Sequence, residues 1–283
     1  MSSVTQDEPL TKRSERHPGQ VRAEENVRAQ VELHRSLAPC YVERYGHDYS
    51  RYYQRDWHQA MVGSLPAHAE RVIDLCCGSG FLIKDLQGRF AKVYGIDLSL
   101  DMLEVARRFV PDARLIAGSA ECMPIRPDSF QAATCKGSLH HTRDHLGFLR
   151  DCAAILEPGG IFVISEPCND NRLLHWLRRA MNRKSDHFDT EDEGFRTQQL
   201  TSLLEKAGLE VPATQAYGVI GYTLSAFPDL VPSMKYVPGN LLLTKLFVRI
   251  DRLICRLPLL RRLAFQVIVV GQKSEHAGSR RER

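Results

Sequence analysis

Short apolar runs alternate with amphipathic stretches from about residue 70 onwards. Apolar runs typical of strands occupy 71–74, 91–97, 113–117, 130–135, 161–164, 209–217 and 265–270. Between them, apolar residues recur at helical spacing over 81–86, 101–108, 146–156 and 197–207. Strands that alternate with helices predict right-handed crossovers and a parallel sheet with helices on both faces. We therefore expect a doubly wound α/β domain that binds ligands at the carboxyl ends of its strands.

The turn after the first strand is the clearest candidate for a binding site. Gly78 and Gly80 lie between a strand that ends at Asp74 and a helix, so backbone N–H groups can approach a ligand without a Cβ in the way. The second strand ends at Asp97, where a doubly wound sheet hydrogen-bonds a ribose. A dinucleotide site and an S-adenosylmethionine site both fit this pattern. The dinucleotide fingerprint needs a third glycine, and its position is taken by Ile83.

Four motifs together resemble those of class I S-adenosylmethionine-dependent methyltransferases. They are Asp74-x-Cys-Cys-Gly-Ser-Gly80, Gly95-Ile-Asp97-Leu-Ser99, Gly118-Ser-Ala-Glu-Cys-Met-Pro124 and the segment 156–167. The family usually has a glycine where this chain has Cys76, as in some members that resemble quinone C-methyltransferases. The resemblance implies a Rossmann-like sheet of seven strands, six parallel and the last antiparallel, and S-adenosylmethionine as cofactor. The positions that it assigns to the cofactor are Asp74, Cys76, Gly78, Gly80, Asp97, Leu98, Met102, Ser119, Ala120, Glu121 and Lys136.

Candidate catalytic groups follow the fourth and fifth strands. His140 and His141 lie where the family places residues that face the methyl group, and either could accept a proton near neutral pH. Glu166 ends the fifth strand; it either acts on the acceptor or hydrogen-bonds a helix or loop. His145 completes an H-H-x-x-x-H pattern, but no carboxylate or second cluster supports a metal site, so we expect none. No Asp/Asn-Pro-Pro-Tyr-like tetrapeptide follows the fourth strand, which argues against amide-nitrogen methylation.

The chain divides into several predicted segments. A disordered tail (1–28) precedes an N-terminal helical lid (29–68), and the core (69–218) carries an insertion at 168–195. A helical cap (219–264), the final core strand (265–273) and a basic tail (274–283) follow. Aromatic residues recur every fourth position in the first helical segment, which would place them on one helix face. They either pack at the domain edge or line a lid over the substrate; the predicted lid residues are Tyr49, Tyr53, Trp57 and Trp176.

Residues 243–257 form an amphipathic pattern. Seven apolar residues fall on one side of the predicted helix, and Lys245, Arg249, Arg252 and Arg256 fall on the other. Two interpretations remain open: a helix packed on the sheet, or a contact with a membrane surface or a lipid substrate.

Composition narrows the functional classes. A net charge of +4 is too small to indicate a nucleic-acid partner. The eight cysteines include no C-x-x-C pair and suit a reducing compartment, so we expect a cytoplasmic protein without a signal peptide. The expected function is methyl transfer to an oxygen or carbon of a small apolar or amphipathic acceptor. The alternatives are a non-catalytic cofactor-binding scaffold and, less favoured, a nicotinamide-dependent oxidoreductase. The oligomeric state is open.

Overall fold

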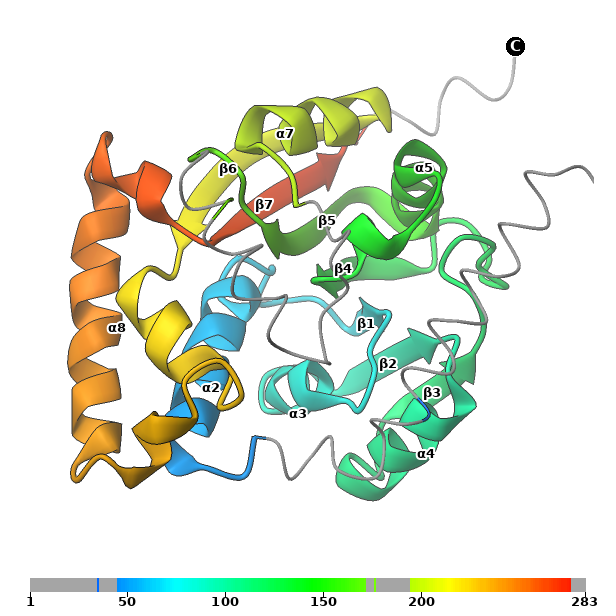
Figure 1. Cartoon of the computed structure of the whole chain (residues 1–283). Coiled ribbons are helices and arrows are strands. Elements are labelled where there is room, and N and C mark those ends of the chain that lie inside the picture. Colours follow the sequence, from blue (N-terminus) through cyan, green and yellow to red (C-terminus); the bar gives the residue numbers. More distant parts are fainter. Residues whose placement is uncertain (1–34, 36–44, 172–175, 177–193, 276–283) are drawn as a thin grey trace, which may run out of the picture.

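The computed structural model describes residues 45–171 and 194–275, together with Arg35 and Trp176. The described chain forms one seven-stranded sheet in the order β3-β2-β1-β4-β5-β7-β6 (Figure 1). Pairing is parallel from β3 to β5, whereas β7 runs antiparallel to both β5 and β6. The predicted fold class is therefore confirmed. The strands are β1 (Arg71–Leu75), β2 (Lys92–Asp97), β3 (Arg114–Ala117), β4 (Phe130–Lys136), β5 (Leu156–Pro167), β6 (Leu209–Tyr217) and β7 (Gln266–Lys273).

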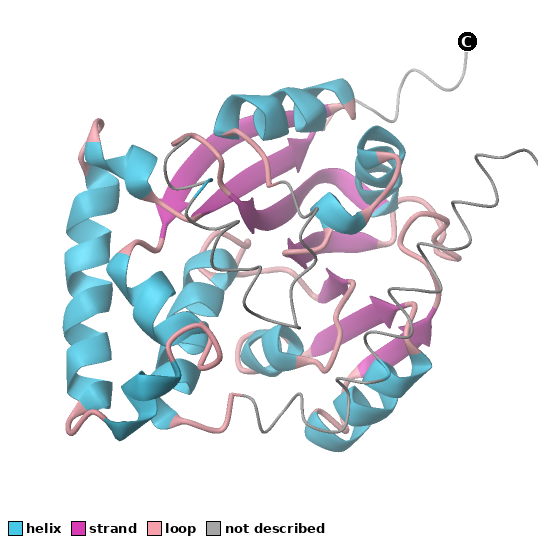
Figure 2. Ribbon diagram, viewed as in Figure 1, coloured by secondary structure: helices cyan, strands magenta, loops and turns pink. Residues whose placement is uncertain are grey.

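Helices cover both faces of the sheet (Figure 2). The longer helices are α2 (Asp48–Val62), α3 (Phe81–Gln87), α4 (Leu100–Phe109), α5 (His145–Ile155), α7 (Thr197–Lys206) and α8 (Asn240–Arg256). Short helical turns lie at η1 (Leu139–His141), η2 (Tyr222–Ala226), η3 (Pro232–Tyr236) and η4 (Leu260–Leu263). No helix in the described ranges is long and apolar enough to cross a membrane.

The core has two halves because alternate strand residues point to opposite faces. Val72 of β1 packs with the layer of α2, α3 and α4, whereas Ile73 and Leu75 pack with the layer of α5 and α7. All three side chains are fully buried. The α8 helix packs on α2 and on the edge strand β6, at the left edge of the molecule in Figure 1, and adds Val248 to the first half of the core. The interpretation of α8 as a helix packed on the sheet therefore holds in part, since the helix meets the sheet at its edge strand β6.

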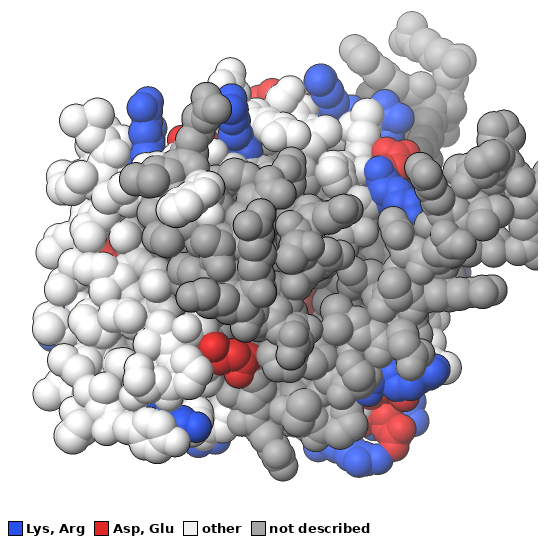
Figure 3. Space-filling model, viewed as in Figure 1, with Lys and Arg blue, Asp and Glu red and all other residues white. Residues whose placement is uncertain are grey.

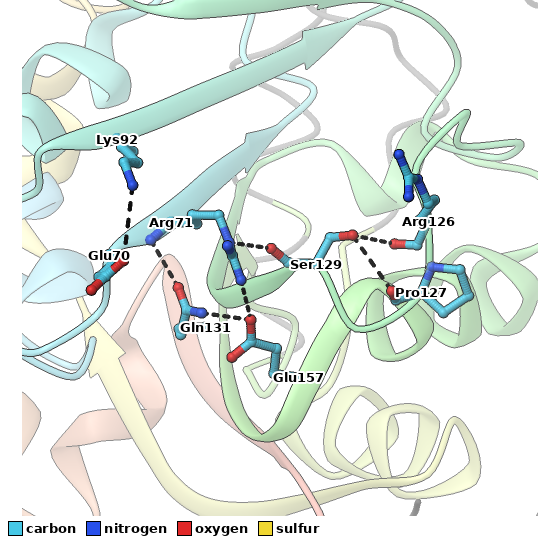
Figure 4. A network of polar contacts seen from close by, with 8 residues as sticks. All are labelled: Glu70, Arg71, Lys92, Arg126, Pro127, Ser129, Gln131 and Glu157. Carbon is cyan, nitrogen blue, oxygen red and sulfur yellow. Dashed lines mark hydrogen bonds and ion pairs between the residues drawn. The ribbon is translucent and has the colours of Figure 1, made fainter.

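A polar network ties together the ends of the strands opposite the predicted site (Figure 4). The Arg71 backbone N–H donates to Gln131 Oε1 at 2.8 Å, and the Arg71 side chain donates to the Ser129 carbonyl at 2.8 Å. Both Arg71 and Gln131 also donate to the Glu157 carboxylate. The starts of β1, β4 and β5 are thereby linked by side chains as well as by the sheet.

Two element boundaries differ from the sequence-based expectation. The helix predicted over 146–156 ends at Ile155, and the strand predicted over 161–164 already begins at Leu156. Leu156 pairs with Phe130, and its carbonyl accepts from Lys273 Nζ at 2.6 Å, so long-range contacts fix the start of the strand. The predicted tails, the first part of the lid and most of the insertion at 168–195 lie outside the described residues.

Candidate active site

The Gly-rich turn carries an unusual run of backbone conformations. Cys76, Gly78 and Gly80 all have positive φ, at 55°, 51° and 82°. A Cβ on Gly80 would lie 2.8 Å from Val110 Cγ2, so this glycine permits the close packing of α3 on α4. A Cβ on Gly78 would meet nothing within 4 Å. The turn therefore presents bare backbone to open space at the carboxyl end of β1, as a bound cofactor requires.

Asp97 lies directly across from this turn, at the end of β2. Its Oδ2 accepts from the Gly78 N–H at 2.7 Å, and its Oδ1 accepts from the Ser99 N–H at 2.9 Å. Ser99 in turn caps α4 by accepting from the Met102 N–H. The Asp97 carboxylate is thus oriented by the backbone on both sides and lies beside the open space over Gly78.

Asp74 is buried beneath the same turn. Thr134 Oγ1 donates to Asp74 Oδ1 at 2.7 Å. Burial raises the pKa of Asp74 to about 7, although the Thr134 hydrogen bond and the nearby charge of Lys136 both lower it. The carboxyl group is therefore poised between its two protonation states near neutral pH, and a cationic ligand group beside it would favour the charged form.

Lys136, at the end of β4, lies in a polar network with α2. Its Nζ donates to Gln54 Oε1 at 2.7 Å, lies 2.8 Å from His58 Nε2 and sits 4.2 Å from the centroid of the Trp57 ring. His58 Nδ1 contacts Asp85 Oδ2 of α3 at 2.6 Å. Burial lowers the pKa of Lys136 to about 7, and burial with the Lys136 charge lowers the pKa of His58 to about 4. Neutral His58 can therefore accept a hydrogen bond from the Lys136 ammonium at Nε2 and donate its Nδ1–H to Asp85.

Three members of this network, Gln54, His58 and Asp85, were not predicted from the sequence. Gln54 and His58 are four residues apart, on the same side of a helix whose neighbouring positions are aromatic. Two polar residues at this spacing beside a buried aromatic stripe were the available signal. Their partner Lys136 is 82 and 78 residues away in the sequence, so only the fold reveals the contact.

The pKa of Lys136 leads to a testable pH dependence. Between about 7 and the ordinary value of 10.5, the unfolded chain holds a proton that the folded chain releases, so the free energy of unfolding should rise with pH over this window. Lys136→Met should show a shallower rise than the wild-type protein in urea unfolding at pH 7, 8 and 9. The exposed Lys84→Met serves as control and should keep the wild-type slope. Equal slopes for Lys136→Met and wild type would show that Lys136 titrates normally.

The loop after β4 is anchored by Glu166 at the end of β5. Glu166 Oε1 accepts from the backbone N–H groups of Ser138 at 2.9 Å and Leu139 at 2.8 Å, and Oε2 contacts His140 Nδ1 at 2.6 Å. The Glu166 side chain is fully buried, and that of His140 is 7% exposed. The ring of the exposed His141 lies beside that of His140, with centroids 4.0 Å apart and the two planes tilted by 41°. The structure thus brings all three predicted catalytic residues together.

The predicted adenine-binding residues lie along one rim. Ser119 Oγ accepts from the Glu121 N–H at 3.1 Å, and Glu121 Oε1 accepts from the Arg143 N–H at 2.8 Å, which links the loops after β3 and β4. Ala120 and Met102 are buried, whereas Leu98 is 42% exposed. Their contact with adenine remains a prediction.

The predicted lid residues differ in their environment. Tyr49, Tyr53 and Trp57 are buried on one face of α2, and Trp176 is exposed. Trp57 stacks on Tyr217 and donates from Nε1 to Ser165 Oγ at 3.0 Å, close to the carboxyl end of β5. The aromatic stripe therefore fixes α2 beside the site, and its role as a lid remains a prediction. Among the described residues, no three His, Cys, Asp or Glu side chains gather as metal ligands would.

Comparisons with known proteins agree with this geometry. Residues 73–164 match a family model described as a methyltransferase domain. The chain is 28% identical over 195 residues to the ubiquinone biosynthesis O-methyltransferase of Bordetella pertussis, covering 59% of this chain and 76% of that protein. It is 31% identical over 113 residues to the demethylmenaquinone methyltransferase of Renibacterium salmoninarum, covering 40% of this chain and 48% of that protein. Across the curated relatives, the matches span between 42% and 76% of the relative's length.

The solved structures show the same fold. A Haloferax volcanii putative methyltransferase, in complex with a methyltransferase activator, superposes with a TM-score of 0.59 at 19% identity. The superposition covers 85% of this chain and 97% of that one. The sheet order, the Gly-rich turn with Asp97 and the matched domain lead to one conclusion. Residues 73–164 carry a methyltransferase domain, and the sheet order and Gly-rich turn resemble those of class I S-adenosylmethionine-dependent methyltransferases.

Proposed function

We propose that the chain transfers a methyl group from S-adenosylmethionine to an oxygen or carbon nucleophile of a small, apolar or amphipathic acceptor. One observation carries the proposal: the open backbone over Gly78 lies directly beside the Asp97 carboxylate, at the carboxyl ends of β1 and β2. S-adenosylmethionine supplies a methyl group on a sulfonium centre, which is already an excellent leaving group. The protein's contribution is therefore mainly binding and alignment.

Each binding group has a matching partner on the cofactor. The Asp97 oxygens suit the two ribose hydroxyls, since a carboxylate accepts strong charge-assisted hydrogen bonds. The bare backbone at Gly78 suits the amino-acid part of the cofactor, whose ammonium would lie near Asp74. A positive charge there favours the ionised form of Asp74, whose pKa is about 7 in the protein alone.

The pair of Glu166 and His140 is the proposed proton acceptor for nucleophiles that must lose a proton. Glu166 holds His140 through Nδ1, so a proton taken from an acceptor would go to Nε2. A buried carboxylate that orients a histidine and stabilises its charged form is a recurrent arrangement in acid–base catalysis. The exposed His141 is the second candidate for the base.

The acceptor class is inferred from two sources. The curated relatives named above are a ubiquinone biosynthesis O-methyltransferase and a demethylmenaquinone methyltransferase, which favours a quinone-type ring with an apolar tail. The aromatic side chains of α2 that are buried close to Lys136 and Ser165 make this edge of the site apolar, which favours an apolar acceptor. Both O- and C-methylation remain within the proposal.

Cofactor binding tests the first half of the proposal. Calorimetric titration should detect binding of S-adenosylmethionine and S-adenosylhomocysteine and none of NADH. Gly78→Ala should weaken that binding about tenfold, since 1.4 kcal/mol of lost contact is enough. The matched control is Gly208→Ala, because Gly208 also has positive φ, 89°, and open space around its Cβ position. Both variants should lose about 1 kcal/mol of folding stability, and only Gly78→Ala should lose affinity.

Methyl transfer tests the second half. Labelled S-adenosylmethionine should pass its methyl group to reduced quinones or apolar phenols in a discontinuous assay. Tight cofactor binding with no transfer to any acceptor would favour the non-catalytic scaffold instead. NADH binding without S-adenosyl ligands would overturn the proposal as a whole.

A further inference from the structure

The α8 helix packs on the protein through an unusually polar seam. Its only buried residues are Thr244, Val248 and Asp251. Thr244 shares a 2.8 Å hydrogen bond with Ser225, and the Asp251 carboxylate accepts from three successive backbone N–H groups at 219–221. Hydrogen bonds therefore hold this helix, together with the buried Val248 and the half-buried apolar residues Leu243, Phe247, Ile250 and Ile254, and other leucines of the helix are left exposed.

Six leucines of α8 and of the segment that follows it are exposed. We call this surface the leucine face: Leu242, Leu246 and Leu253 on α8, and Leu257, Leu259 and Leu260 after it. Their exposed fractions lie between 41% for Leu260 and 80% for Leu259. Tyr236, at the end of η3 just before α8, is 77% exposed. Among the described residues, only three other large apolar side chains are as exposed, so the exposed apolar surface is concentrated here.

The leucine face follows one line along the helix. Positions 242, 246, 253 and 257 are separated by four, seven and four residues, which places them on one stripe. The stripe lies opposite the buried seam at 244, 248 and 251. In the view of Figure 3, the molecular edge formed by α8 is largely free of charged side chains.

Basic residues flank this stripe. Lys245, Arg249 and Arg256 are exposed along one side of α8, and Arg261 and Arg262 are exposed directly after the last leucines. The remaining arginine of the helix, Arg252, is bound to Asp56 of α2. Asp251 is the only acidic residue between 230 and 274, and it is buried. The exposed surface therefore combines leucines with positive charge and no exposed acid.

We propose that the leucine face docks on an anionic lipid bilayer, with α8 lying in the plane of the interface. An interfacial helix buries its apolar side among the acyl chains and keeps lysine and arginine at the phosphates. A second copy of this chain is a poorer occupant, because the basic residues beside the leucine faces of the two copies would repel each other. The proposal rests on this surface alone and goes beyond methyl transfer. It would bring the enzyme to acceptors that are dissolved in a membrane.

The α2 helix connects this surface to the candidate active site. Asp56 of α2 holds Arg252 of α8 and accepts from Tyr217 Oη at 2.9 Å, whereas Gln54 and His58 of the same helix hold Lys136. One helix thus contacts both the docking surface and the end of β4. A membrane-bound α8 would place α2 and the active-site edge at a fixed distance from the interface.

Vesicle co-sedimentation of the full chain tests the proposal. The wild-type protein should bind vesicles of phosphatidylcholine mixed with phosphatidylglycerol and bind pure phosphatidylcholine much more weakly. The double variant Leu246→Gln, Leu253→Gln should reduce binding at least tenfold, because two leucines would no longer enter the bilayer. The matched control is Leu100→Gln: Leu100 is 68% exposed at the start of α4 and should not affect binding.

A second pair of substitutions tests the charge. Arg249→Gln and Arg256→Gln should each weaken binding to the anionic vesicles about fivefold, since each basic residue near such a surface contributes about 1 kcal/mol. Circular dichroism should show unchanged helix content in all variants, because the replaced side chains are exposed. Absence of wild-type binding to anionic vesicles would overturn the proposal. So would light scattering that showed a dimer dissociated by the leucine substitutions, since the face would then join two copies.

Discussion

Asp97→Ala should weaken binding of S-adenosylmethionine and S-adenosylhomocysteine by about two orders of magnitude. The replacement removes both oxygens that we assign to the ribose, and each charge-assisted hydrogen bond contributes about 1.5–3 kcal/mol. It also releases the Gly78 N–H, which Asp97 Oδ2 holds at 2.7 Å, so the turn that approaches the cofactor loses its support. Isothermal titration of both ligands measures the effect directly.

Two further variants separate charge from shape at this position. Asp97→Asn keeps the size of the side chain and should bind with intermediate affinity. Asp101→Ala removes a nearby exposed carboxylate that pairs with Arg35, and should bind as the wild-type protein does. Unchanged affinity in Asp97→Ala would show that the ribose lies elsewhere and would remove the main support for the cofactor site.

Glu166→Ala should lower the free energy of unfolding by about 3–5 kcal/mol, the range for removal of one partner from a buried charged network. The backbone N–H groups of Ser138 and Leu139 and the ring of His140 would all lose their acceptor inside the protein. Since the Glu166 side chain is fully buried, water cannot easily replace it. Urea unfolding at constant pH measures the loss.

The control for this variant lies at the other end of the same strand. Glu157→Ala removes a carboxylate that also has two partners, Arg71 and Gln131, but its side chain is 29% exposed. We expect a loss of about 1 kcal/mol, because solvent can reach the groups left behind. A loss for Glu166→Ala no larger than that for Glu157→Ala would contradict the anchoring role.

The same substitutions address catalysis when rate is measured beside stability. His140→Ala leaves the carboxylate bonded to Ser138 and Leu139, so it should fold with a smaller loss than Glu166→Ala. If His140 is the base, the rate should fall and its dependence on pH should change while cofactor affinity stays constant. If the pH dependence of the rate is unchanged in His140→Ala, His140 is not the base. The base is then His141, or no histidine acts as the base.

Much of the fold followed from local sequence pattern. The alternation of apolar runs and amphipathic stretches predicted the strands and most helices, because each such element must bury one face and its period records which residues do so. The Gly-rich turn and Asp97 could also be predicted as parts of the cofactor site, since a close approach of the backbone requires glycine and a ribose site requires an acid. The structure then placed Gly78 and Asp97 in direct contact.

Other features depended on partners that are distant in the sequence. Lys136 meets Gln54 and His58 only because α2 packs beside the end of β4, and Glu166 meets the loop at 138–140 only because β4 and β5 are neighbours. Neither pairing leaves a local pattern. The resulting shifts in the pKa values of Lys136 and His58 come from burial, which a sequence does not specify.

The α8 helix shows most clearly what the sequence alone could not predict. Its sequence determined that leucines would lie on one side and arginines on another, because that follows from helical spacing alone. The tertiary structure decided which side would meet the protein. The segment 219–225, which follows β6, supplies hydrogen-bonding partners for Asp251 and Thr244. These contacts orient the helix so that Leu242, Leu246 and Leu253 are exposed. An amphipathic sequence predicts that a helix has one apolar and one polar face. Which face is buried depends on the residues that pack against the helix in the folded protein.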